Sequence, residues 1–299
     1  MAELGVMIEA QEGLTWERWR GIVADTERLG FASLRVSDHC QSVFGVEGRE
    51  SLHAWMALAL AAEWTERVQL APMVSPLTFY EPGVLARMAI AVDQLSGGRL
   101  LLGVGTGWNA AEHETFGIPF PDLGPRFDRL ERGIELIERL NAEIPGARRL
   151  PLLIGGSGER RTLPLAARHA AEWNVHGVSP DEFRAKSAVL DRACAEAGRD
   201  PGEIRRSMMT SVIVGRTRDD LRERAARLAR FLPPLAGLEP DEVIEQLGQR
   251  WPAGTPDEIV ARLRPFADAG VQTFLIQHFL LDDPEELEIL AQDVVPTLA

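Results

Sequence analysis

The sequence predicts a closed barrel of eight parallel strands surrounded by helices, the (β/α)8 or TIM-barrel fold. Short apolar segments alternate with longer segments of helical periodicity from end to end of the 299-residue chain, which is typical of repeated βα units. Eight such strands over this length fit the usual size of the barrel. A doubly wound open sheet is the alternative, but it usually has a GxGxxG turn after its first strand, where this chain has IEAQEGLTW.

The first half of the chain contains four predicted βα units. Their strands are short apolar runs, as expected where both faces of a strand are buried. These strands are expected at residues 4–8, 33–36, 68–74 and 100–104. Apolar residues recur at helical spacing between them, at residues 15–29, 52–65 and 82–95. The turn residues Ser96, Gly97 and Gly98 separate the third of these helices from the fourth strand.

The second half supplies four more strands, at residues 152–154, 173–175, 211–214 and 273–277. Helical periodicity is found at residues 126–141, 159–169, 180–197, from 218 onward, 256–269 and 284–293. A proline-rich stretch at residues 231–254 is an excursion before the last βα unit, and it could cap one end of the barrel. We therefore expect residues 1–299 to form one barrel domain.

Composition argues against several classes of function. The formal net charge is −13, with acidic residues interspersed among arginines, so we expect no nucleic-acid partner. The longest wholly apolar stretch, residues 54–62, is too short to span a membrane, and no signal segment is recognisable, which favours the cytoplasm. Two cysteines and six scattered histidines suggest neither a disulfide framework nor a metal site. Lys186 is the only lysine, which argues against Schiff-base chemistry.

A (β/α)8 barrel places its active site where the residues that follow each strand converge. The candidate residues are Ser37, Asp38, His39 and Cys40 after the second strand, Val74, Ser75 and Pro76 after the third, Thr106, Gly107, Trp108 and Asn109 after the fourth, and Gly155, Gly156, Ser157 and Gly158 after the fifth.

Asp38 and His39 are the predicted catalytic pair. A histidine at a strand end can donate a proton near neutral pH while a nearby carboxylate sets its orientation and charge. The alternative is structural, with Asp38 capping the following turn and His39 packing on its neighbours. Cys40 would need a lowered pKa to act as a nucleophile, and we interpret it as a residue of the pocket wall.

Two glycine-rich segments indicate where a cofactor would bind. Gly103, Gly105 and Gly107 remove side chains where the fourth strand ends, which would let a ligand approach the backbone or would serve a tight turn. The segment IGGSGER at residues 154–160 opens a helix, so its backbone N–H groups and the helix end would suit a phosphate. A plain helix cap explains the same glycines, and no GxxxxGK[ST] motif of a nucleotide triphosphatase is present.

Three residues after the fourth strand have open roles. The indole of Trp108 could cover a flat ring, wall off the substrate or pack beneath a loop. Glu112 could cap the next helix or hydrogen-bond a ligand, and His113 is expected to face solvent.

With these residues in place, the chain resembles the bacterial luciferase-like flavin-dependent oxidoreductases, and within them the branch that uses the deazaflavin coenzyme F-420. The resemblance runs nearly end to end. It is carried by GVMIEAQEGLTWERW at residues 5–19, SDH at 37–39, the segment from VSPLTFYEPG to LLLGVGTGW at 74–108, EHETFGIPFP at 112–121, PLLIGGSG at 151–158 and GTPDEIVARL at 254–263.

The resemblance implies a luciferase-like (β/α)8 barrel, a homodimer, and a bulge with a non-prolyl cis peptide at Met73 and Val74. It implies that His39 handles a proton beside the redox ring and that Asp38 contacts the ring system. Backbone N–H groups in the PLLIGGSG segment would hold the phosphate. The residues expected to contact the cofactor are Asp38, His39, Met73, Val74, Ser75, Thr106, Gly107, Trp108, Glu112, Ile154, Gly155, Gly156, Ser157 and Gly158.

The implied activity is hydride transfer between coenzyme F-420 and a small organic substrate. The alternatives are an FMN-dependent two-component monooxygenase fed by a separate reductase, and a non-catalytic member that carries the cofactor. The chain departs from the family in three places. Trp108 stands where a sugar-phosphate dehydrogenase of this branch has glutamate, the connection at residues 140–152 is short, and the usual Asp-Gly-Trp reads Ala171, Glu172 and Trp173.

Overall fold

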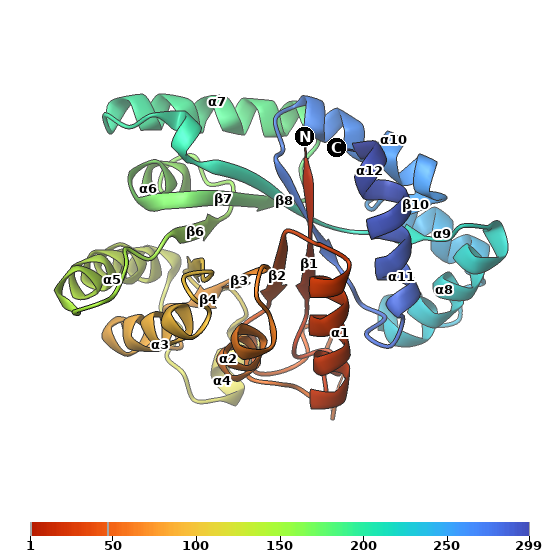
Figure 1. Cartoon of the computed structure of the whole chain (residues 1–299), viewed down its shortest axis with the longest axis horizontal. Coiled ribbons are helices and arrows are strands. Elements are labelled where there is room, and N and C mark those ends of the chain that lie inside the picture. Colours follow the sequence, from red (N-terminus) through yellow and green to blue (C-terminus); the bar gives the residue numbers. More distant parts are fainter. Residues whose placement is uncertain (1, 47, 299) are drawn as a thin grey trace.

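The computed structural model describes residues 2–46 and 48–298, and in this part of the chain a parallel sheet curves into a barrel with helices outside it (Figure 1). The sheet order is β3-β2-β1-β11-β8-β7-β6-β5-β4. The strands are β1 (Glu3–Ile8), β2 (Ser33–Val36), β3 (Gln69–Pro72), β4 (Ser75–Pro76), β5 (Leu102–Gly105), β6 (Leu152–Gly155), β7 (Ala170–His176), β8 (Arg205–Ser211) and β11 (Thr273–Gln277).

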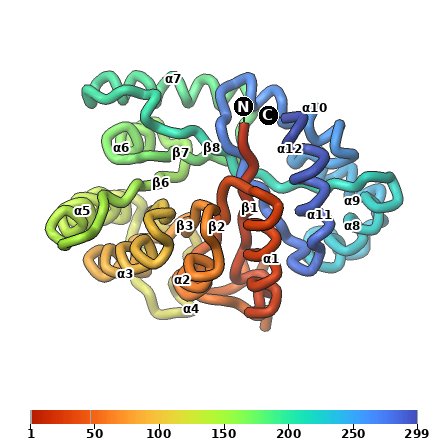
Figure 2. The backbone as a smooth tube through the Cα atoms, viewed as in Figure 1, coloured from red at the N-terminus to blue at the C-terminus, as the bar shows by residue number. Residues whose placement is uncertain are grey.

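The barrel closes at one interrupted strand. β3 lies within the predicted third strand, whereas β4 begins just after the predicted end at residue 74 and pairs with β5. Leu70 of β3 forms a parallel bridge with Leu100, which joins the two ends of the sheet. The first and last strands are also neighbours, since β1 pairs with β11, and Figure 2 shows the chain circling once between them. The predicted (β/α)8 fold is therefore confirmed.

Helices cover the outside of the barrel, and most agree with the predicted segments to within a few residues. They are α1 (Trp16–Arg28), α2 (Ala54–Trp64), α3 (Pro82–Leu95), α4 (Ala110–Thr115), α5 (Leu123–Glu143), α6 (Thr162–His169), α7 (Pro180–Glu196), α8 (Arg218–Phe231), α9 (Pro240–Gly248), α10 (Pro256–Asp268), α11 (Pro284–Ile289) and α12 (Val295–Leu298). No helix among the described residues is long and apolar enough to cross a lipid bilayer.

The predicted seventh strand is wrong in position. The barrel strand is β8, Arg205–Ser211, whereas Ile213–Val214 forms β9 and pairs outside the barrel with β10, Ala253–Gly254. The sequence RRSMMTS of β8 is polar because Ser207 faces a polar barrel interior, where its hydroxyl donates to Glu172 at 2.7 Å. A search for apolar runs therefore missed this strand and selected the next one.

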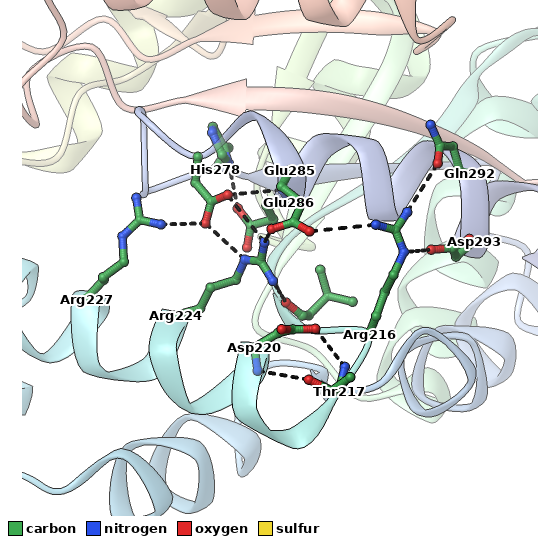
Figure 3. Close-up of polar contacts among 12 residues, drawn as sticks. Arg216, Thr217, Asp220, Arg224, Arg227, His278, Glu285, Glu286, Gln292 and Asp293 are labelled. Atoms are coloured by element: carbon green, nitrogen blue, oxygen red, sulfur yellow. Dashed lines mark hydrogen bonds and ion pairs between the residues drawn. The ribbon is translucent and has the colours of Figure 1, made fainter.

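Residues 231–254 form a short 3₁₀ turn, Pro233–Leu235, followed by α9 and β10. Their apolar side chains pack with α8 in a separate cluster that includes Phe279, beyond the end of β11. Ion pairs attach α8 to the segment before α11: Arg224 and Arg227 contact the buried Asp283 at 3.0 and 2.8 Å. Figure 3 shows these arginines on one side of α8, facing Glu285 and the pair His278–Glu286. The excursion is thus fixed beside the carboxyl end of β11.

Candidate functional site

Asp38 follows β2 and lies almost fully buried, with 4% of its surface exposed. The hydroxyl of Ser75 donates to its Oδ2 at 2.5 Å, and that of Tyr80 donates to its Oδ1 at 3.0 Å. The Trp55 indole N–H fixes the Ser75 hydroxyl in turn at 3.1 Å. Burial raises the pKa of the Asp38 carboxyl, and the hydrogen bonds and the nearby His53 oppose this rise only in part.

His39 pairs with Glu112, which the start of α4 places beside it. His39 Nδ1 lies 2.8 Å from Glu112 Oε2, and the other carboxylate oxygen accepts the backbone N–H of Cys40. Because a carboxylate oxygen accepts, Nδ1 carries a hydrogen, and Nε2 is the ring nitrogen that no other described residue hydrogen-bonds. Burial lowers the pKa of His39, but Glu112, with the charges of Glu9 and Asp38, outweighs burial and raises the pKa above its ordinary value.

The neighbouring histidine does not behave as predicted. His113 is 1% exposed rather than facing solvent. Its Nδ1 lies 2.7 Å from the carbonyl of Asn109, and its Nε2 lies 2.8 Å from the hydroxyl of Thr78. His113 therefore ties α4 to the end of β4, and this holds Glu112 in place.

The expected bulge is present between β3 and β4, where the peptide bond from Met73 to Val74 is cis. The glycines of β5 make room for it. A Cβ on Gly103 would lie 2.1 Å from the carbonyl oxygen of Pro72, and one on Gly105 would lie 2.7 Å from a methyl group of Val74. The sequence alone explains these glycines by the close approach of a ligand or by a tight turn. Neither explanation includes packing against the bulge, because that packing depends on the neighbouring strand.

Replacing Gly103 by Ala should therefore lower the stability by about 1–3 kcal/mol, the usual effect of overpacking. The obstacle is a backbone atom, which cannot move aside like a flexible side chain. Gly21→Ala is the matched control, because a Cβ at this helical position meets nothing within 4 Å. Denaturant midpoints measure both variants. A Gly103→Ala protein as stable as wild type would contradict the packing described here.

Gly107 and Trp108 follow β5. Gly107 has a φ of +75°, and a Cβ there would lie 2.6 Å from the Thr78 hydroxyl, so this position requires glycine. Its carbonyl accepts a hydrogen bond from Arg126 and one at 3.3 Å from the hydroxyl of Thr106. Trp108 is 65% exposed, so the alternative that it packs beneath a loop is wrong. Its ring stands edge-on to His39, with centroids 5.5 Å apart.

The segment after β6 has the features of an anion site. Gly156 has a φ of +118° and donates its N–H to the carbonyl of Asn174 at 2.9 Å. Ser157 and Gly158 are exposed, and within the described residues their backbone N–H groups donate to no protein acceptor. The arrangement fits a phosphate group. Ile154 is also predicted to contact the cofactor. Its side chain is instead buried in the core between the barrel and its helices, and it does not face this site.

Sequence reasoning missed a chain of polar residues beside His39. Glu9 follows β1 and accepts hydrogen bonds from Gln11 at 2.9 Å and from Gln277 at 2.6 Å. Gln11 in turn accepts from the hydroxyl of Ser37 at 2.5 Å. Glu9 stands directly after the first strand, so the rule that identified Asp38 and His39 would also have found it.

The remaining features limit what the site can do. Burial raises the pKa of the Cys40 thiol to about 11, which agrees with a wall residue rather than a nucleophile. A cavity of about 620 Å³ lies near the carboxyl ends of β7, β8 and β11. Gln277 lines this cavity as well as contacting Glu9, so the cavity borders the polar chain beside His39.

A (β/α)8 barrel with a histidine–glutamate pair, a buried acid and an exposed glycine-rich turn at one end has the arrangement of the barrels that bind small molecules at the carboxyl ends of their strands. The comparisons identify the family. The model of the luciferase-like monooxygenases matches residues 1–273, and the chain belongs to that family.

Its relatives include proteins named for coenzyme F420. The chain is 28% identical to an F420-dependent glucose-6-phosphate dehydrogenase of Microbacterium testaceum, over 93% of this chain and 91% of that protein. It is also 28% identical to an F420-dependent hydroxymycolic acid dehydrogenase of Mycobacterium tuberculosis, over 91% and 82%. Among solved structures, an F420-dependent secondary alcohol dehydrogenase in complex with an F420-acetone adduct matches with a TM-score of 0.81 and 18% identity, covering all of both chains.

Proposed function

We propose that this protein is an oxidoreductase that transfers hydride between coenzyme F-420 and a small organic substrate. The observation that carries the proposal is the His39–Glu112 pair, which holds a free imidazole nitrogen beside the buried Asp38. The relatives named as F420-dependent dehydrogenases support the choice of cofactor.

The residues at the strand ends divide into a holding set and a proton-handling set. When bound, the coenzyme supplies or accepts the hydride. The bulge at Met73–Val74, together with Thr106 and Gly107, would support its ring system, and the turn at 155–158 would hold its phosphate through backbone N–H groups.

His39 acts on the substrate. With Nδ1 held by Glu112, its Nε2 donates a proton to the substrate oxygen or nitrogen during reduction and accepts one during oxidation. Trp108, edge-on to His39, walls the same space. Fixed groups of this kind keep the substrate oriented without rearrangement at the moment of reaction.

Cofactor binding tests the proposal directly. Titration of the purified protein with F-420, followed by fluorescence, should show binding at micromolar concentration, with FMN binding more weakly. Tight FMN binding without F-420 binding would overturn the proposal and favour the flavin-dependent monooxygenase, whose reductase partner would then be sought.

The turn at residues 155–158, proposed above to hold the phosphate, gives a sharper version of this test. Ser157→Asp should raise the Kd for F-420 by about tenfold, because a carboxylate would stand beside the bound anion. Ser157→Asn is the matched control of nearly equal size, and it should bind nearly as wild type does. Ser157 is exposed, so neither change should disturb folding. Equal affinities for the two variants would place the phosphate elsewhere.

The pH dependence of substrate reduction should depend on Glu112. A proton donor works while it is protonated, so activity is present at low pH and is lost as the pH rises through the pKa of His39. Glu112 raises that pKa. Glu112→Gln should lower it and move the loss of activity to lower pH. A pH profile of kcat/KM measures the shift, and a uniform loss at every pH would contradict it.

We also propose that the protein is a cytoplasmic homodimer. Trp16, Met56 and Val84 stand in the first turns of α1, α2 and α3 and are 44%, 60% and 58% exposed. Because α2 contacts both α1 and α3, these exposed apolar side chains stand on neighbouring helices, where a second copy of the chain would cover them. Sedimentation equilibrium should give twice the monomer mass of 33.0 kDa.

A further inference from the structure

A chain of hydrogen bonds leads from the buried carboxyl of Asp38 to the surface. Asp38 Oδ1 accepts from the hydroxyl of Tyr80 at 3.0 Å, and Tyr80 Oη lies 3.5 Å from Nε2 of His53. Asp38 is 4% exposed, Tyr80 is half-buried and His53 is exposed. Three side chains therefore connect the interior of the site with solvent.

The hydrogens along this chain point in one direction. His53 is the N-cap of α2, and its Nδ1 accepts the backbone N–H of Trp55 at 3.2 Å. A neutral imidazole that accepts at Nδ1 carries its hydrogen on Nε2. Nε2–H then donates to Tyr80, and Tyr80 donates to Asp38, so every donor faces inward.

We propose that His53, Tyr80 and Asp38 form a proton relay between solvent and the interior of the site. The proposal rests on the hydride-transfer function given above. Transfer of a hydride to a substrate leaves a proton to be released on the cofactor side and another to be donated on the substrate side. His39 serves the substrate, and the relay serves the other side through Asp38.

The relay conserves atoms and transfers no electrons. A proton from solvent binds Nδ1 of His53 in place of the bond from Trp55. The N–H bond at Nε2 breaks as its proton passes to Tyr80 Oη, and the former Tyr80 proton forms an O–H bond with Oδ1 of Asp38. The reverse sequence releases a proton from the site.

The surroundings of the relay suit this task. The groups facing Asp38 are Ser75, Tyr80, His53 and His39. Burial raises the pKa of Asp38, so that its carboxyl can hold a proton. Burial and the nearby Asp38 also raise the pKa of Tyr80, which therefore stays a hydroxyl and passes protons without ionising.

Tyr80 is the only tyrosine of the chain, so the relay can be tested in the protein without cofactor. Labelling tyrosine with ¹³C at Cζ gives a single NMR resonance. Its chemical shift should differ between wild type and His53→Ala, because the variant removes the group that donates to the Tyr80 hydroxyl. His169→Gln is the control, because this histidine pairs with Glu138 on α5. Nitrogen shifts should show neutral His53 with hydrogen on Nε2. A Tyr80 resonance that is unchanged in His53→Ala would overturn the relay. A neutral His53 with its hydrogen on Nδ1 would overturn it as well.

A single turnover with bound F-420 tests the transport itself. Deazaflavin absorbance reports the hydride step, and a pH-indicator dye reports proton exchange with solvent. In Tyr80→Phe and His53→Ala, proton exchange should lag behind hydride transfer by about tenfold to a hundredfold. Added imidazole should restore the rate in His53→Ala but not in Tyr80→Phe. Proton exchange as fast as hydride transfer in both variants would overturn the relay. Absence of hydride transfer in the wild-type protein would instead overturn the proposed function.

Discussion

Replacing His39 by Asn is expected to lower kcat/KM for F-420-dependent hydride transfer by about 10²- to 10⁴-fold, the usual contribution of a general acid or base. An asparagine amide can still donate to Glu112, so the pocket keeps its shape. It has no group that titrates near neutral pH, so it cannot give a proton to the substrate. Steady-state kinetics with F-420 measures the loss.

Two controls separate loss of catalysis from loss of structure. The Kd for F-420 should change far less than kcat/KM in His39→Asn, because the asparagine amide keeps a hydrogen bond to Glu112 and the turn at residues 155–158 and the Met73–Val74 bulge are untouched. His169→Gln, at the end of α6, should keep wild-type turnover. If His39→Asn also kept wild-type turnover, the proton would come from another group. If neither the wild-type protein nor His39→Asn turned over, the non-catalytic carrier of the cofactor would be favoured.

Much of this site follows from the sequence because strand ends converge in a closed parallel barrel. That rule placed Asp38, His39 and Trp108 at one end before any contact was known. It could not pair His39 with Glu112, which are separated by 73 residues. Their contact depends on how α4 is fixed by His113, a residue whose polarity predicted the opposite, exposed position.

The fold was predictable to a similar extent, and the prediction of one strand, β8, failed for a similar reason. Apolar runs identify strands whose inward faces are apolar, such as β5 and β6. One part of the barrel interior is polar instead, and β8 faces it with Ser207, where a valine or leucine was sought. The glycines at 103 and 105 likewise serve the neighbouring bulge, which local sequence does not reveal.

The polar interior centres on an ion pair that crosses the barrel. Arg35 of β2 and Glu172 of β7 are 1% and 2% exposed, and their side chains meet at 3.1 Å. Gln69 accepts from the same guanidinium nitrogen at 2.7 Å, and Ser207 donates to the other carboxylate oxygen at 2.7 Å. Burial lowers the pKa of Arg35, and the charge of Glu172 opposes that shift. The two charges thus depend on each other.

Arg35→Met is expected to destabilise the protein by about 3–5 kcal/mol, because it leaves the carboxyl of Glu172 buried without an opposite charge. The double variant Arg35→Met with Glu172→Leu should be more stable than Arg35→Met alone, since apolar residues of similar size can replace a buried pair at little cost. Denaturant midpoints measure both, provided that each protein unfolds in one cooperative transition.

The order of the two stabilities decides what the pair contributes. A double variant more stable than Arg35→Met shows that the cost lies in the unpaired charge, so the sequence tolerates a polar or an apolar barrel interior as long as it is consistent. A double variant less stable than Arg35→Met would instead mean that Gln69, Asn174 and Ser207, which surround the pair, need its charges to satisfy their own hydrogen bonds. In that case the whole polar network, rather than the ion pair, would fix the position of β8 in the barrel.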